Sequence, residues 1–422
     1  MNVLIRQAKI IAPGSPYHGK TNDILIESGK ITSIKKSIST KGSVKTIEEE
    51  GLCVSIGFMD LQAVSGDPGF EHRETLESLA QAARKGGFTA ICLHNHNYPA
   101  LHSKSQIAHL RATAADLDVD VLPFGTVTVD GKGKDLAEMY DMHLAGAVGF
   151  SDYKTAPADS GMVVRALQYA SHFNVFLCLH ANEEGLSKGG QMNEGETSTA
   201  LGMKGIPALA EELALQKNIS ILEYAGGKMH VPVISTKGSV DLIKKAKATG
   251  LPISCGVPAV NLVYDDTALK EFDTNFKLHP PLRTKRDINA LRNAIENGTI
   301  DVVVSDHSPL DLECKELEFD QAEVGMISLQ STFNLLVEAL GDKSDALIVR
   351  LLAENPRKLL ALELPKIAEG EKANLTFFTL KGESILDKTH NASLSENSPL
   401  FGKPLKGKVI GTFYKGKLVL NS

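Results

Sequence analysis

Short apolar segments alternate with helical segments through the middle of the chain, and this alternation restricts the fold more than any other feature of the sequence. Parallel strands need a long crossover connection, usually a helix, so a strand–helix repeat predicts a parallel sheet. Between residues 56 and 365 there are eight such strands, the number in a (β/α)8 barrel, whose active site lies at the carboxyl ends of the strands. The strands are Gly57–Leu61, Thr89–Leu93, Val119–Phe124, Ala147–Phe150, Val175–Leu179, Lys228–Val233, Pro252–Cys255 and Ile300–Val304.

Both ends of the chain are β-rich. Near the start, Asp23–Ile26 and Ile31–Ile34 flank a Gly29 turn, which is typical of a hairpin. Near the end, Ala373–Phe378 and Gly407–Val419 have the same strand–turn–strand character. We therefore predict an α/β protein in which residues 1–55 and 366–422 form a small β-sandwich and residues 56–365 form a (β/α)8 TIM-type barrel.

Composition excludes several functional classes. Hydrophobic residues make up 42% and charged residues 23%, as in ordinary globular proteins. A net charge of −6 provides no basic surface for nucleic acid. No segment approaches the roughly 18 apolar residues of a membrane-spanning helix, and the five scattered cysteines favour a reducing compartment. We expect a cytoplasmic protein that binds neither nucleic acid nor membranes.

Residues 55–69 have the sequence S-I-G-F-M-D-L-Q-A-V-S-G-D-P-G. This stretch resembles the P-G-F-I-D-x-H-V-H-L-R-x-P-G signature of the dihydroorotase family of metal-dependent amidohydrolases. Further resemblances follow in the family's order along the chain, at residues 193–196, 201–207, 235–240, 276–283 and 398–409. The resemblance implies an amidohydrolase-type barrel. It also implies the chemistry of active members, which reversibly cyclise N-carbamoyl-L-aspartate to L-dihydroorotate in de novo pyrimidine synthesis.

Active members hold zinc, which lowers the pKa of bound water and polarises the scissile carbonyl. A catalytic zinc needs about three protein ligands. Of the six ligand positions that the resemblance implies, His180 and Asp306 remain, whereas the other four carry Gln62, Val64, Tyr153 and Val233. Two alternatives stay open on the fourth strand: Lys154 could correspond to the carboxylated lysine of other branches, and a one-residue shift would place Asp152 at the ligand position.

The positions that contact substrate in the family are also changed. Asn95 matches the asparagine of the family's P-N-T segment, and His307 matches the first histidine of D-H-A-P-H. His279 replaces the asparagine before Pro-Pro-Leu-Arg, and Gly66 removes an arginine that would clamp a carboxylate bidentately. We predict weak substrate-binding roles for Asn95, His307 and His279.

Several of these side chains could also have a purely structural role. His180 and Asp306 could be hydrogen-bonded polar residues at the barrel mouth that bind no metal. His94 and His96 have a spacing that places both rings on one side of a strand. The family has no ligand on that strand, so we favour a loop role over a relocated metal site.

The leading hypothesis is a non-catalytic dihydroorotase homologue without a metal cofactor. It would have a structural or regulatory role with aspartate carbamoyltransferase or an active dihydroorotase, and we expect a homo-oligomer. The rival hypothesis is an active dihydroorotase or related cyclic-amide hydrolase with a rebuilt, mononuclear zinc site and Asp306 as general base. A third is small-molecule sensing in a retained pocket.

Overall fold

The computed structural model describes residues 2–40, 42–156, 159–341 and 344–421. Eight parallel strands form a barrel in the hydrogen-bonded order β15-β14-β13-β10-β9-β8-β7-β6. The barrel closes between its last and first strands, where the Val64 amide donates to the His307 carbonyl over 3.0 Å. The strands are β6 (Phe58–Ala63), β7 (Phe88–Leu93), β8 (Asp120–Gly125), β9 (Gly149–Phe150), β10 (Leu177–Cys178), β13 (Met229–Val231), β14 (Ile253–Pro258) and β15 (Val302–Val304). The predicted (β/α)8 fold class is confirmed.

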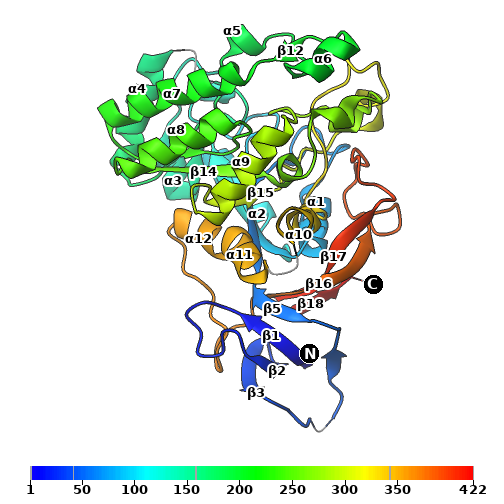
Figure 1. Ribbon diagram of the computed structural model, residues 1–422. Coiled ribbons are helices and arrows are strands. Elements are labelled where there is room, and N and C mark those ends of the chain that lie inside the picture. The colour runs from blue at the N-terminus through cyan, green and yellow to red at the C-terminus, as the bar shows by residue number, and fades with distance from the viewer. Residues whose placement is uncertain (1, 41, 157–158, 342–343, 422) are drawn as a thin grey trace.

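Helices surround the barrel (Figure 1). The α-helices are α1 (Leu76–Lys85), α2 (Lys104–Thr113), α3 (Met139–Ala145), α4 (Ser160–Ser171), α5 (Glu184–Ser187), α6 (Glu196–Leu201), α7 (Ala208–Ala225), α8 (Lys237–Ala248), α9 (Lys285–Glu296), α10 (Thr332–Leu340), α11 (Asp345–Val349) and α12 (Asn355–Leu359). Single helical turns occur at η1 (Val129–Gly131), η2 (Ala259–Leu262), η3 (Asp266–Leu269), η4 (Thr274–Phe276) and η5 (Leu312–Cys314), and the π-helix η6 (Arg350–Glu354) joins α11 to α12. A small parallel pair, β11 (Met192–Asn193) and β12 (Gly205–Ile206), lies outside the barrel sheet.

The first helix, α1, begins at Leu76 after a capping box. Residues Arg73 and Glu74 precede α1 instead of opening it, because Thr75 caps the helix. The Thr75 hydroxyl accepts from the Ser78 amide, and the Ser78 side chain accepts from the Thr75 amide, which satisfies two otherwise free donors. The loop between β6 and α1 therefore includes Arg73 and Glu74 and brings them to the surroundings of the barrel mouth.

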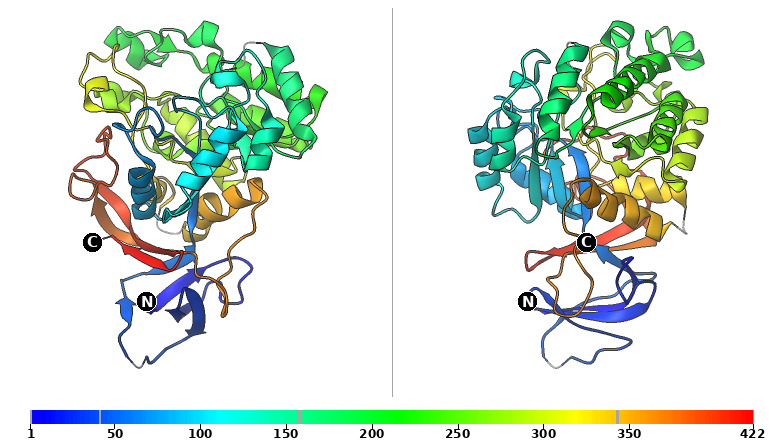
Figure 2. Two further views of the ribbon diagram at one scale, coloured as in Figure 1. Left: turned by 180° about the vertical axis from the view of Figure 1, so that it is seen from behind. Right: turned by 90° about the vertical axis from the view of Figure 1, so that its left-hand side faces the viewer.

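The two ends of the chain meet in one sheet beside the barrel (Figures 1 and 2). Its hydrogen-bonded order is β18-β17-β16-β5-β1-β2-β3, and β4 pairs with β1. The antiparallel pairing of β16 with β5 joins the C-terminal strands to the N-terminal ones. The strands are β1 (Val3–Ile11), β2 (Thr21–Glu27), β3 (Lys30–Lys35), β4 (Lys45–Ile47), β5 (Cys53–Ile56), β16 (Leu375–Ile385), β17 (Pro404–Tyr414) and β18 (Lys417–Leu420).

Two apolar cores hold the barrel. One fills the barrel interior, with Met59 and Leu61 from β6 and Val302 and Val304 from β15 among its members. The other lies between the strands and the surrounding helices and continues into the terminal sheet. The guanidinium of Arg84 crosses from α1 to the terminal sheet, where its Nε donates to Thr412 Oγ1 over 2.6 Å. The interior core and the contacts with the terminal sheet therefore both support the barrel strands whose ends form the mouth.

Candidate functional site

The side chains that the sequence predicts for the site converge at the carboxyl ends of the barrel strands. Gln62 lies on β6, His180 follows β10 and Asp306 follows β15. The chain after β9 adds Tyr153 and Lys154. These ends meet at one edge of a closed barrel, so residues far apart in sequence become neighbours there.

An ion pair joins two of these strand ends. Lys154 Nζ lies 2.9 Å from Asp306 Oδ2, and both side chains are about 15% exposed. Burial alone would lower the pKa of Lys154, but the Asp306 carboxylate outweighs burial and raises this pKa to about 12. Gln62 Nε2 donates to the other oxygen, Asp306 Oδ1, at a long 3.5 Å. The retained carboxylate of the predicted metal site is therefore already bound to a cation of the chain itself.

The contacts of Lys154 and Asp152 bear on the two alternatives for the fourth strand. A carboxylated Lys154 would place a second negative charge against Asp306, whereas an ammonium fits the 2.9 Å contact. The Asp152 carboxylate binds the loop after β8 instead, where it accepts hydrogen bonds from the amides of Val127 and Thr128 over 2.8 and 3.1 Å. The structure thus leaves Asp152 as an anchor for the loop after β8 and places Lys154 in the mouth.

Val64, Val233 and Tyr153 occupy three of the four substituted positions without a ligand role. Val64 and Val233 are both 1% exposed, and Val233 belongs to the apolar core inside the barrel. The ring of Tyr153 lies 5.2 Å from Lys154 Nζ. Apolar and aromatic contacts therefore replace donor atoms at these strand ends.

His180 is the least satisfied polar side chain at the mouth. It is 4% exposed, and neither ring nitrogen has a hydrogen-bond partner among the residues that the structure describes. Burial lowers its pKa well below the ordinary value, and the neighbouring His279 and Lys154 act in the same direction. The His279 ring lies 5.0 Å from the His180 ring, and burial lowers the pKa of His279 to about 3. Both imidazoles are neutral at physiological pH.

Two of the three residues predicted from the family's substrate contacts, Asn95 and His307, hold loops in place. Asn95 Oδ1 accepts from the Leu101 amide over 2.8 Å. His307 is 1% exposed, its Nδ1 accepts from the Ser328 amide over 3.0 Å, and its Nε2 lies 3.4 Å from Glu74 Oε2. These contacts position the loops after β7 and β15 around the mouth.

His94 and His96 do not form a metal site together. His94 is fully buried, its Nε2 contacts the Leu61 carbonyl at 2.8 Å, and its ring stacks on Phe124 at 4.3 Å. Burial lowers the pKa of His94 to about 4. His96 is exposed on the following loop. The two rings therefore lie in different surroundings, with His94 buried against Phe124 and His96 on the loop after β7.

Zinc does not fit this set of donors. Within the ranges that the structure describes, no three His, Cys, Asp or Glu side chains are grouped so that they could hold a metal ion. A catalytic zinc site needs about three such ligands. At the mouth, Asp306 is paired with Lys154, and the nearest substituted positions offer an amide and two valines.

Sequence reasoning underrated Lys154 and missed the role of Arg283. Arg283 is 3% exposed, and its guanidinium donates to Ser235 Oγ, Asn193 Oδ1 and the Ile206 carbonyl over 2.7–3.0 Å. It links the loop after β13 to the β11–β12 pair. The sequence carries a signal for this role, because Arg283 directly follows the largely apolar segment Leu278–Leu282. An arginine that is buried with such a segment needs several hydrogen-bond acceptors.

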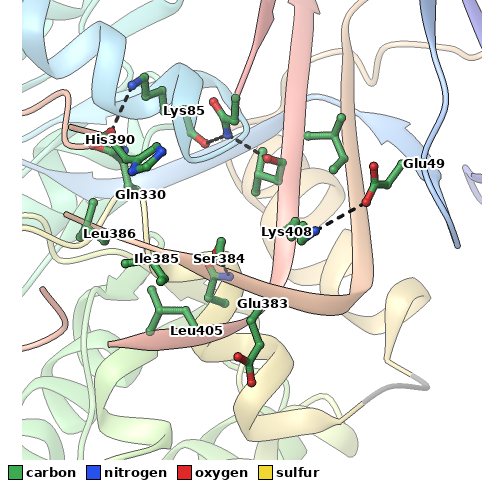
Figure 3. A pocket seen from close by; sticks show the side chains of 14 residues that line it. Glu49, Lys85, Gln330, Glu383, Ser384, Ile385, Leu386, His390, Leu405 and Lys408 are labelled. Atoms are coloured by element: carbon green, nitrogen blue, oxygen red, sulfur yellow. Dashed lines mark hydrogen bonds and ion pairs between the residues drawn. The ribbon is translucent and has the colours of Figure 1, made fainter. Parts of the chain in front are cut away.

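A separate cavity of about 520 Å³ lies between the terminal sheet and the barrel helices (Figure 3). Its lining includes Lys85 from α1, Asn334 from α10 and Lys408 from β17. Lys85 Nζ donates to the His390 carbonyl over 3.1 Å, and Lys408 Nζ lies 3.6 Å from Glu49 Oε1. None of the residues predicted for the site lines this cavity, so it is distinct from the barrel mouth.

The described part of the chain contains no helix that is both long and apolar enough to cross a membrane. The fold is similar to that of L-hydantoinase (dihydropyrimidinase) from Arthrobacter aurescens, with a TM-score of 0.85 and 23% identity over 99% of this chain and 96% of that one. A D-hydantoinase structure gives a TM-score of 0.80 at 20% identity, covering 100% and 95%. These similarities show that the chain has the same fold as these proteins, a (β/α)8 barrel with a β-sheet beside it.

Sequence comparison gives the family. The dihydro-orotase-like family model matches residues 52–239. The chain is 34% identical to a dihydroorotase of Geobacter metallireducens and 33% identical to one of Syntrophus aciditrophicus, in each case over 99% of both chains. This protein belongs to the dihydroorotase family, as its sequence motifs predict.

Proposed function

We propose that this chain is a non-catalytic member of the dihydroorotase family that acts in de novo pyrimidine synthesis. Its role would be structural or regulatory, in assembly with aspartate carbamoyltransferase or with an active dihydroorotase. The observation that carries the proposal is the 2.9 Å pair between Lys154 and Asp306. This contact engages the carboxylate that would otherwise serve as general base.

The chemistry of ring opening explains why this pair matters. Hydrolysis of a cyclic amide needs a group that activates water and a group that stabilises charge on the carbonyl oxygen. A general base alone contributes about 10²- to 10⁴-fold, and electrostatic stabilisation of the developing oxyanion is usually the larger part. With Asp306 and Lys154 paired to each other and His180 a weak base, neither the carboxylate nor the ammonium is free to serve these functions.

One observation favours the second candidate, an active cyclic-amide hydrolase with a rebuilt site. Both nitrogens of the buried His180 ring lack partners in the described part of the chain, so this ring could contact a bound molecule. The full-length similarity to relatives named dihydroorotase points the same way. In this candidate, His180 and Asp306 act on N-carbamoyl-L-aspartate or L-dihydroorotate.

Turnover by the purified chain separates the two candidates. We expect no conversion of L-dihydroorotate or N-carbamoyl-L-aspartate above the uncatalysed rate, with or without added zinc, because Asp306 is engaged. The same chain should co-elute with aspartate carbamoyltransferase or an active dihydroorotase in size-exclusion chromatography. Turnover that falls at least about 100-fold in Asp306→Ala or His180→Ala would instead establish the active hydrolase.

A further inference from the structure

The positive charge at the barrel mouth comes from the chain itself. Asp306 is a largely buried carboxylate, and a buried carboxylate is costly unless a cation and hydrogen bonds compensate it. Lys154 is this cation, and its Nζ also donates a hydrogen bond to Asp306 Oδ2 over 2.9 Å. Gln62 Nε2 approaches the other carboxylate oxygen, Oδ1. The pair spans the barrel from the end of β9 to the end of β15.

The backbone on both sides of this pair is held in an uncommon conformation. Tyr153 has a φ of 55° and Asp306 a φ of 51°, in the left-handed region that non-glycine residues rarely adopt. Such a conformation is unfavourable for a side-chain-bearing residue and persists where surrounding contacts impose it. Tyr153 is fixed by its amide, which donates to Ser151 Oγ over 3.0 Å, and its position directs Lys154 to Asp306.

We propose that the Lys154 ammonium is the permanent cation of this barrel mouth and takes the place of a metal ion as the partner of Asp306. A metal ion bound by Asp306 would have to displace the ammonium or share the carboxylate with it, and two cations in such proximity repel. The mouth is therefore assembled and electrically balanced without metal. This inference goes beyond the proposed function, because it holds whether or not the chain turns over a substrate.

A double-mutant cycle on thermal unfolding tests the proposal. Lys154→Met and Asp306→Asn should each lower the melting temperature by about 3–6 °C, because each leaves a buried partner uncompensated. The double variant should melt within about 2 °C of the wild type, because it removes both charges together. Purified wild-type protein should retain no stoichiometric zinc after incubation with zinc and dialysis, and zinc should not raise its melting temperature.

The exposed pair Lys381–Glu50 is the matched control. Its atoms lie 2.7 Å apart, but the side chains are 66% and 84% exposed, so Lys381→Met and Glu50→Gln should show no coupling. Additive effects of the two mouth substitutions, or a stoichiometric zinc ion that stabilises the wild type, would overturn the inference. Turnover without metal would contradict the proposed function but leave the role of Lys154 intact.

Discussion

Acidification from pH 7 to pH 5 is expected to remove a large part of the folding stability of this protein. Burial lowers the pKa of His94 to about 4 and of His230 to about 3, while the unfolded chain has the ordinary value of 6.5. Between pH 6.5 and these lower values the unfolded state binds protons that the folded state does not, so stability falls as the pH falls. By pH 5 each of these two rings contributes a loss of about 2 kcal/mol.

Other groups at the mouth modify this loss. His180 and His279 change stability in the same direction, because burial also lowers their pKa values. Asp60 opposes them: burial raises its pKa to about 6, so below that pH the folded state takes up a proton before the unfolded state does. Burial raises the pKa values of four further carboxyl groups in the same way, those of Asp67, Asp152, Asp301 and Asp306. The four imidazoles are charged in the unfolded chain at pH 5 and neutral in the fold, so we expect the net effect of acid to remain destabilising.

Urea denaturation at a series of pH values measures this effect. His230→Gln should reduce the steepness of the decline by about one proton per chain, because a neutral amide replaces a ring that titrates only on unfolding. Gln can keep the hydrogen bond to Ser254 Oγ, which His230 Nδ1 contacts at 2.8 Å. The exposed His172→Gln is the control and should leave the profile unchanged. A stability that is flat from pH 7 to pH 5 would contradict the buried, neutral state of these rings.

The fold was predictable from sequence because it depends on local patterns. Each barrel strand is a short apolar run followed by a helix, and this periodicity is visible without knowledge of the neighbours. The substitutions at Val64 and Val233 could also be recognised from sequence, because both residues lie within stretches that otherwise resemble the family's motifs. Both valines are 1% exposed, and Val233 packs into the apolar core inside the barrel.

The Lys154–Asp306 pair could not be predicted in the same way. Its partners are separated by 152 residues and meet only because the barrel closes. Their approach also depends on the left-handed backbone at Tyr153, a residue whose side chain disfavours that conformation. Asn95 and His307 show another limit of sequence analysis. A motif match identifies their positions in the family, but it does not show that their side chains are already hydrogen-bonded to neighbouring loops.

Replacement of Arg283 by methionine is expected to lower the free energy of unfolding by about 3–5 kcal/mol. The Arg283 guanidinium is the cation of a buried polar network that includes Glu211, Asn193 and Asp266. Glu211 is 4% exposed and accepts from the amides of Ser235 and Thr236 over 2.9 and 3.1 Å. Methionine fills similar space but leaves two buried carboxylates without their counter-charge.

Urea denaturation at pH 7 with two further variants separates charge from geometry. Arg283→Lys keeps the positive charge, but a single ammonium cannot contact Ser235, Asn193 and the Ile206 carbonyl together as the guanidinium does. The decrease in the free energy of unfolding should therefore be smaller than for Arg283→Met. The nearby exposed Arg286→Met should change stability by less than about 0.5 kcal/mol. If Arg283→Met behaved like Arg286→Met, the network would contribute little. The segment that carries His279 would then be held beside His180 by apolar contacts, because Leu278 and Leu282 would be its remaining buried anchors.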